Sequence, residues 1–89
     1  ASDGGAYVVA ELRMSSYKNN RLCWIPEHLI ARQVKTLCND DDTLNDPSPH
    51  QAFEQRAHYA LNLLIAYADA LGTVRAGGLI NHEKFMNGM

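Results

Sequence analysis

Cysteine and histidine are the residues of this chain that could bind a metal ion or supply a nucleophile and its base. The two cysteines, Cys23 and Cys38, lie fifteen residues apart, and the four histidines are His28, His50, His58 and His82. None of the close Cys–Cys or His–His spacings that complete a tetrahedral zinc site is present. The chain also lacks a G-x-S-x-G turn and a phosphate-binding glycine loop. The sequence therefore predicts a non-enzymatic protein with no catalytic residue, no cofactor and no bound metal.

Cysteine usage bears on the cellular compartment. Two buried, reduced thiols are the favoured interpretation, while a Cys23–Cys38 disulfide and metal binding remain alternatives. No apolar run approaches the roughly 20 residues that span a bilayer. These features favour a cytoplasmic protein that does not bind membranes.

Length and charge limit the size and partners of the protein. Eighty-nine residues make one domain, and a hydrophobic content of 46% with 20% charged residues is ordinary for a globular protein. The net charge of -2 provides no overall basic field, so non-specific binding of nucleic acid is not expected as the main function.

The clearest element is a long helix over residues 48–72. Ser48 is a good N-cap, Pro49 suits the first helical position, and Gln51 completes a capping box. Gly72 is suited to the position that follows the last helical residue. The rest of the chain must be arranged around this helix.

Two apolar stripes run along the predicted helix. The broad one consists of Phe53, Ala57, Ala60, Leu61, Leu64, Ala68 and Leu71. The smaller one consists of Ala52, Tyr59, Leu63, Ala66 and Ala70. Either the helix is central and covered by its own domain, or the smaller stripe is the seam of a homodimer. We take the smaller stripe as the candidate protein-interaction surface.

Alternating apolar residues predict a β-hairpin before this helix. Residues 6–14 and 21–25 read as two strands joined by a polar turn, and residues 26–39 read as a helix opened by Pro26. The predicted fold is α+β, a small β-hairpin packed on two helices in the order β-β-α-α, with a short C-terminal helical or irregular element. Residues 6–86 would form the compact domain, between flexible ends at 1–5 and 87–89.

Basic residues offer a weaker candidate surface. His28, Arg32 and Lys35 would follow one face of the helix over 26–39, either solvated or in contact with an acidic partner or nucleic acid. The segment over residues 66–85 resembles a helix-turn-helix through its Ala68 and Gly72 pair, but the glycines at 77 and 78 fall inside the would-be recognition helix. Arg75 would be its early DNA contact, followed by Asn81, His82 and Lys84.

The function that follows is contact with another protein. The sequence favours a small regulatory or adaptor protein that forms a homodimer through its long helix. The alternative is a DNA-binding transcriptional regulator that uses the degenerate helix-turn-helix-like C-terminal segment.

Overall fold

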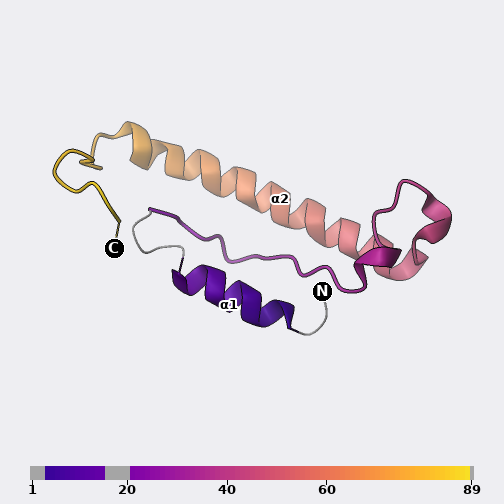
Figure 1. Ribbon diagram of the computed structural model, residues 1–89. Coiled ribbons are helices and arrows are strands. Elements are labelled where there is room, and N and C mark those ends of the chain that lie inside the picture. Colours follow the sequence, from indigo (N-terminus) through magenta and orange to yellow (C-terminus); the bar gives the residue numbers. More distant parts are fainter. Residues whose placement is uncertain (1–3, 16–20, 89) are drawn as a thin grey trace.

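The part of the chain that the structure describes folds into two α-helices and two short 3-10 helices. The computed structural model describes residues 4–15 and 21–88. In these ranges α1 spans Gly5–Ser15 and α2 spans Pro47–Ala76, with the 3-10 helices η1 at Val34–Thr36 and η2 at Asp42–Leu44. No β-strand occurs in them. The predicted α+β fold is therefore wrong, and Figure 1 shows a helical chain in which α2 is the dominant element.

Helix α2 confirms the long predicted helix, with both ends shifted outwards. Asp46 is the N-cap, and Pro47 and Pro49 fall in the first turn, where a missing N–H breaks no helical hydrogen bond. Gly72 stays helical at a cost of about 1 kcal/mol relative to alanine. The helix ends four residues later, where Gly77 is the C-cap and Gly78 has a φ of 71°.

The first predicted strand is instead helix α1. Residues 6–14 are almost all apolar, so an alternating pattern and a helical pattern fit them equally well. Alanine, leucine, glutamate, arginine and methionine all favour helix. Gly5, Val9 and Arg13, spaced four apart, are less exposed than the residues between them, which is the periodicity of a helix with one face covered.

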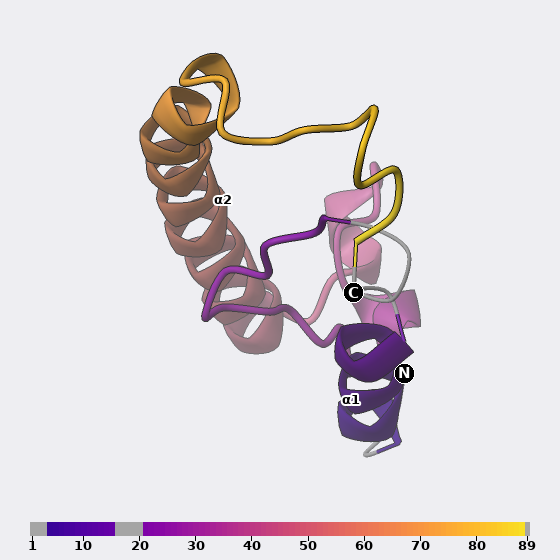
Figure 2. The same ribbon diagram turned by 90° about the vertical axis from the view of Figure 1, so that its left-hand side faces the viewer.

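The second predicted strand has no partner to pair with. Residues 21–31 run as an extended, irregular segment between α1 and α2, as the two views in Figures 1 and 2 show. The predicted hairpin turn lies outside the described residues. The predicted helix over 26–39 is also wrong beyond the single turn η1, because Gln33 and Cys38 adopt left-handed backbone conformations with φ of 51° and 54° that a continuous α-helix excludes.

Polar contacts attach the extended segment to both helices. The Arg13 guanidinium of α1 donates to the carbonyl oxygens of Ile25 at 3.0 Å and Glu27 at 3.4 Å, and it lies 5.5 Å from the centre of the Trp24 ring. On the other side, the Glu27 carboxylate forms an ion pair with Arg56 of α2. An arginine side chain can donate to several oxygen atoms at once because its planar guanidinium carries five N–H donors.

The C-terminal segment folds back onto the start of the extended segment. Arg21 donates to the carbonyl oxygens of Phe85, Met86 and Asn87. The predicted C-terminal element is thus irregular, with a turn at residues 82–84 in which Asn81 Oδ1 accepts from the Lys84 N–H.

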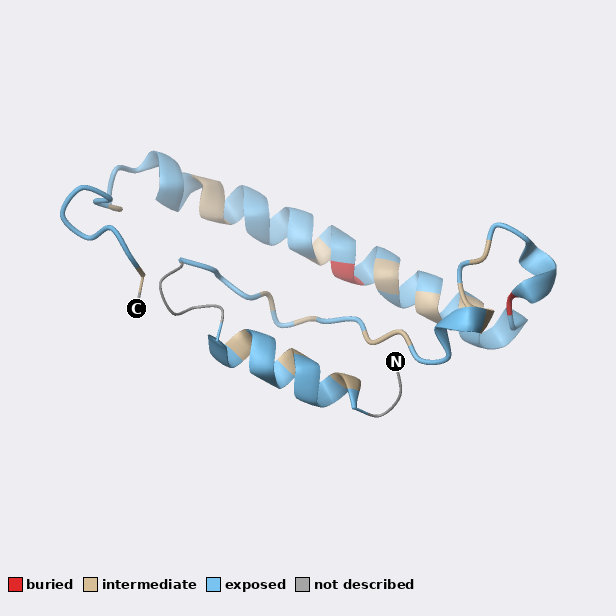
Figure 3. Cartoon of the chain, in the orientation of Figure 1, coloured by how far each residue is buried: buried red, intermediate tan, exposed pale blue. Residues whose placement is uncertain are grey.

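The described chain has almost no hydrophobic core. Ala60, at 7% exposure, is the one buried hydrophobic residue in the described ranges, and Figure 3 shows how little of the chain is buried. The radius of gyration is 17.3 Å, against about 12 Å for a compact domain of this length. The apolar side chains of this chain are therefore left largely in contact with water.

Candidate interaction surface

A closed loop positions the start of α2. Asn45, only 8% exposed, accepts from the Asn39 backbone N–H at 2.8 Å and donates to the Asn39 carbonyl at 3.2 Å and to Asp42 Oδ1 at 3.1 Å. The Asp46 N–H then donates to the Thr36 carbonyl at 2.9 Å. These bonds fold residues 33–46 onto themselves immediately before α2 begins.

The η2 turn within this loop is capped by a carboxylate. Asp41 Oδ1 accepts from the Thr43 hydroxyl at 2.6 Å and from the Thr43 N–H at 3.0 Å. The hydroxyl, followed by the backbone N–H, lowers the pKa of Asp41 below its ordinary value of 3.8, because both donors stabilise the ionised form.

One side of α2 faces the rest of the chain. Ala60 is buried there, and Phe53 and Ala57 are half-buried on the same side. These residues belong to the broad predicted stripe. Between Phe53 and Leu64, the covered part of the stripe is limited to these three residues, because Leu61 is 55% exposed and Leu64 is 47% exposed.

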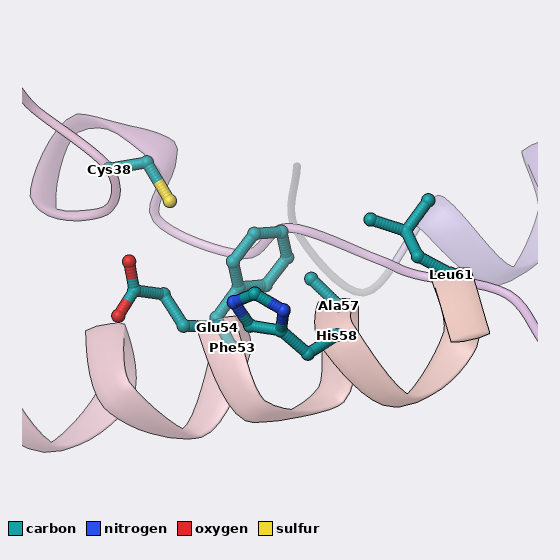
Figure 4. A pocket seen from close by; sticks show the side chains of 6 residues that line it. All are labelled: Cys38, Phe53, Glu54, Ala57, His58 and Leu61. Carbon is teal, nitrogen blue, oxygen red and sulfur yellow. The ribbon is translucent and has the colours of Figure 1, made fainter.

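A shallow pocket of about 220 Å³ lies where the loop meets this side of α2. Figure 4 shows Cys38 extending from the loop over Phe53, with Glu54 and His58 on the helix below. The sequence did not predict this grouping, because Cys38 and His58 are twenty residues apart and only the fold of the loop brings them to one pocket.

The pocket has the residue types of a thiol nucleophile and a base, but not their arrangement. The Cys38 backbone N–H, rather than the thiol, donates to His50 Nδ1 at 3.2 Å, and His50 Nε2 lies 3.6 Å from Glu54 Oε1. Within the described residues no hydrogen bond joins the Cys38 sulfur to an imidazole, whereas an activated nucleophile needs a base within reach.

The smaller predicted stripe lies on the outside of α2. It is turned about 100° around the helix axis from Ala60, as the 3.6-residue repeat requires. Tyr59 is 52% exposed, Leu63 is half-buried, and the alanines at 52, 66 and 70 are exposed. The structure thus places all five predicted interaction residues along one accessible side of a single helix.

Two surface depressions follow this stripe. The first is lined by Ala52, Gln55, Arg56 and Tyr59, and the second by Leu63, Ala66, Tyr67 and Ala70. The Arg56 guanidinium lies 5.5 Å from the centre of the Tyr59 ring while it pairs with Glu27. The sequence did not identify Arg56 as part of this surface, although its position four residues after Ala52 and three before Tyr59 is a usable signal.

The predicted basic contact residues are not brought together on a helix. His28 and Arg32 lie in the irregular segment and Lys35 lies in η1, and all three are exposed. Arg75 is at the end of α2 and donates to the Ala68 carbonyl at 3.2 Å. The helical spacing that grouped the first three residues therefore does not apply to them.

The turn required by a helix-turn-helix does not occur at Gly72. Helix α2 continues through this residue to Ala76, and residues 79–88 contain no helix. Arg75, which would begin a recognition helix, instead belongs to the last turn of α2.

The described residues also bear on a metal site, a disulfide and a membrane span. Across residues 4–15 and 21–88, no cluster of three or more histidine, cysteine or acidic side chains is placed to hold a metal ion. Cys23 and Cys38 are both free and exposed, which differs from the buried thiols expected from the sequence. In the same ranges, neither helix combines the length and the apolar character needed to cross a membrane.

Comparison with known proteins adds no family to this description. Neither protein-family models, nor curated proteins, nor solved structures yield a match to the chain. The smaller stripe of α2 with its two depressions is therefore a candidate surface by its own exposure and chemistry alone.

Proposed function

We propose that this protein is a small, non-enzymatic regulatory or adaptor protein that acts through protein–protein contact and self-associates through α2. The observation that carries the proposal is the exposure of apolar side chains around this helix. Tyr59, Leu61, Leu64, Ile65, Tyr67 and Val74 are each at least 40% exposed.

A helix that is apolar on most sides is normally buried in a protein. Contiguous exposed apolar patches on soluble proteins commonly mark interaction sites. Among the described residues of α2, Ala60 is the one fully buried hydrophobic residue, so burial of the exposed apolar side chains requires another molecule. Burial of apolar area contributes roughly 25 cal/mol per Å², which makes association through this surface favourable.

A second copy of the chain is the partner that this surface itself supports. The candidate surface is continuous along α2, and its neighbours Gln55 and Asn62 are exposed and uncharged. It therefore carries no block of like charge that would repel an identical surface.

Sedimentation velocity over a range of concentrations tests this function. We expect a dimer at high micromolar concentration, and we expect Tyr59→Glu to shift the protein towards monomer because it places a charge in the seam. Ile65→Glu is the matched control, because Ile65 is 60% exposed on a different side of α2. A wild-type protein that stays monomeric at high micromolar concentration contradicts the proposal.

We further propose that this protein works in the cytoplasm. Both cysteines are free and exposed, and exposed thiols persist in a reducing compartment. Intact cells are treated first with an impermeant and then with a membrane-permeant thiol reagent, and Cys23 and Cys38 should react with the permeant reagent alone; labelling by the impermeant reagent, or by neither, contradicts this location.

A further inference from the structure

The candidate surface of α2 has a directional pattern of side-chain size. Its residues fall into two interleaved series, each with a step of seven: Ala52, Tyr59, Ala66 and Thr73 in one, and Arg56, Leu63 and Ala70 in the other. Alternating steps of three and four are the spacing of a coiled-coil seam, here sustained for three heptads. From position 56 onwards, the large side chains lie at positions 56–63 and the small ones at positions 66–73, while Ala52 is a further small residue at the start of the series.

We infer that a second copy of the chain packs against this surface with its α2 antiparallel, so that the large half of each helix meets the small half of the other. This inference rests on the proposed self-association and specifies its geometry. A two-fold axis between Leu63 and Ala66 places Leu63 opposite Ala66 of the second copy. It also places Tyr59 opposite Ala70 and Arg56 opposite Thr73.

Packing density distinguishes this arrangement from the parallel one. In the antiparallel pair each layer formed by positions 56–73 combines one large and one small side chain, which fills the space between the helices evenly. A parallel pair would stack Tyr59 on Tyr59 and Leu63 on Leu63, and would hold the helices too far apart for the alanines at 66 and 70 to touch. The lost contacts in such gaps weaken an interface.

Charge supports the same orientation. Arg56 is a cation within the large half, and Asp69 is an exposed anion beside the small half. An antiparallel pair brings Arg56 near the C-terminal half of the other helix, where both Asp69 and the negative end of the helix dipole lie. A parallel pair instead places the two Arg56 side chains against each other.

The pocket near Cys38 does not compete with this surface. It lies on the side of α2 that carries Phe53 and Ala57, so the loop and the second copy occupy different sides of the helix. The Glu27–Arg56 ion pair also remains possible in the dimer, since one guanidinium offers five donors.

A size-swap cycle tests the orientation. Tyr59→Ala and Ala70→Tyr are made singly and together, and the dimer Kd of each is measured by sedimentation equilibrium. Each single variant is expected to weaken the dimer about tenfold or more, through a cavity or through overpacking. The double variant restores one large and one small side chain in the same layer, so its Kd should return to within about fivefold of the wild type.

Spin-label distances supply a second measurement that leaves the seam unchanged. A label at Gln55→Cys, in a chain that also carries Cys23→Ser and Cys38→Ser, should give an intermolecular distance of about 30 Å in the antiparallel pair, from the 1.5 Å rise per residue. A parallel pair would bring these labels to about 10 Å, one interhelical spacing. Asn62→Cys, close to the two-fold axis, is the control that should give a short distance in either orientation.

The outcomes separate this inference from the proposed function. A wild-type monomer would overturn both. A dimer in which the two substitutions are additive, or in which the Gln55 labels lie close together, overturns the antiparallel orientation and leaves self-association standing. Circular dichroism of each variant verifies that α2 is retained before its Kd is compared.

Discussion

The loop over residues 33–46 and helix α2 differ in whether their side chains find partners within the chain. The loop closes its polar groups internally, with Asn45 buried among hydrogen-bond partners from Asn39 and Asp42. The backbone groups of α2 form hydrogen bonds within the helix, but most of its apolar side chains are exposed. In the described residues, the polar groups of the loop are thus closed within one chain, whereas most apolar side chains of α2 are not buried.

Removal of the Asn45 side chain should give the largest effect on the loop. Asn45→Ala deletes the acceptor of the Asn39 N–H and the donor to Asp42. We expect a loss of about 1–3 kcal/mol in the free energy of local opening, because buried partners are left unpaired. Hydrogen exchange of the Asn39 amide measures it.

Asn81→Ala is the control for this substitution. The Asn81 side chain accepts one bond, from the Lys84 N–H at 2.8 Å, in an exposed turn, so its loss should cost less than about 0.5 kcal/mol. Equal losses in the free energy of local opening for the two variants would show that the buried hydrogen bonds of Asn45 stabilise the loop no more than an exposed bond does.

Helix α1 provides an intermediate case, because polar contacts rather than a core attach it. Arg13→Met removes the hydrogen bonds to Ile25 and Glu27 and the contact with Trp24. We expect the free energy that holds α1 against residues 21–31 to fall by about 1 kcal/mol. A change in Trp24 fluorescence detects this loss. Arg13→Lys keeps the charge but not the planar fork, so it should recover only part of the loss. Full recovery with lysine would mean that charge alone attaches α1.

The smallest expected effect concerns the cap of η2. The pKa of Asp41 is lowered by the Thr43 hydroxyl and N–H. The ionised carboxylate therefore stabilises the loop at pH values above the ordinary pKa of an aspartate. This stabilisation is lost as the pH falls through the lowered pKa of Asp41. Thr43→Val removes the hydroxyl donor and should raise the Asp41 midpoint towards 3.8. An NMR titration of the Asp41 carboxyl carbon measures the shift, and identical midpoints in both proteins would show that the hydroxyl has no role.

The residues of the candidate surface were accessible to sequence reasoning, but their neighbours were not. Ala52, Tyr59, Leu63, Ala66 and Ala70 follow from helical spacing alone, because they share one helix. Arg56 shares this helical spacing and lines the first of the two depressions, but its ion pair with Glu27 joins residues far apart in the chain and could not be predicted. The pocket of Cys38 and His58 likewise depends on the backbone of the loop.

The sequence by itself determined the long helix. Its signals are local: prolines in the first turn, good helix formers throughout, and glycines beyond the end. Tertiary structure alone decided the rest. Residues 6–14 became α1 and residues 21–31 stayed extended, because short apolar runs fit either period and take the form that their neighbours allow. A strand needs a partner strand for its backbone hydrogen bonds, and in the described chain residues 21–31 lie between two helices.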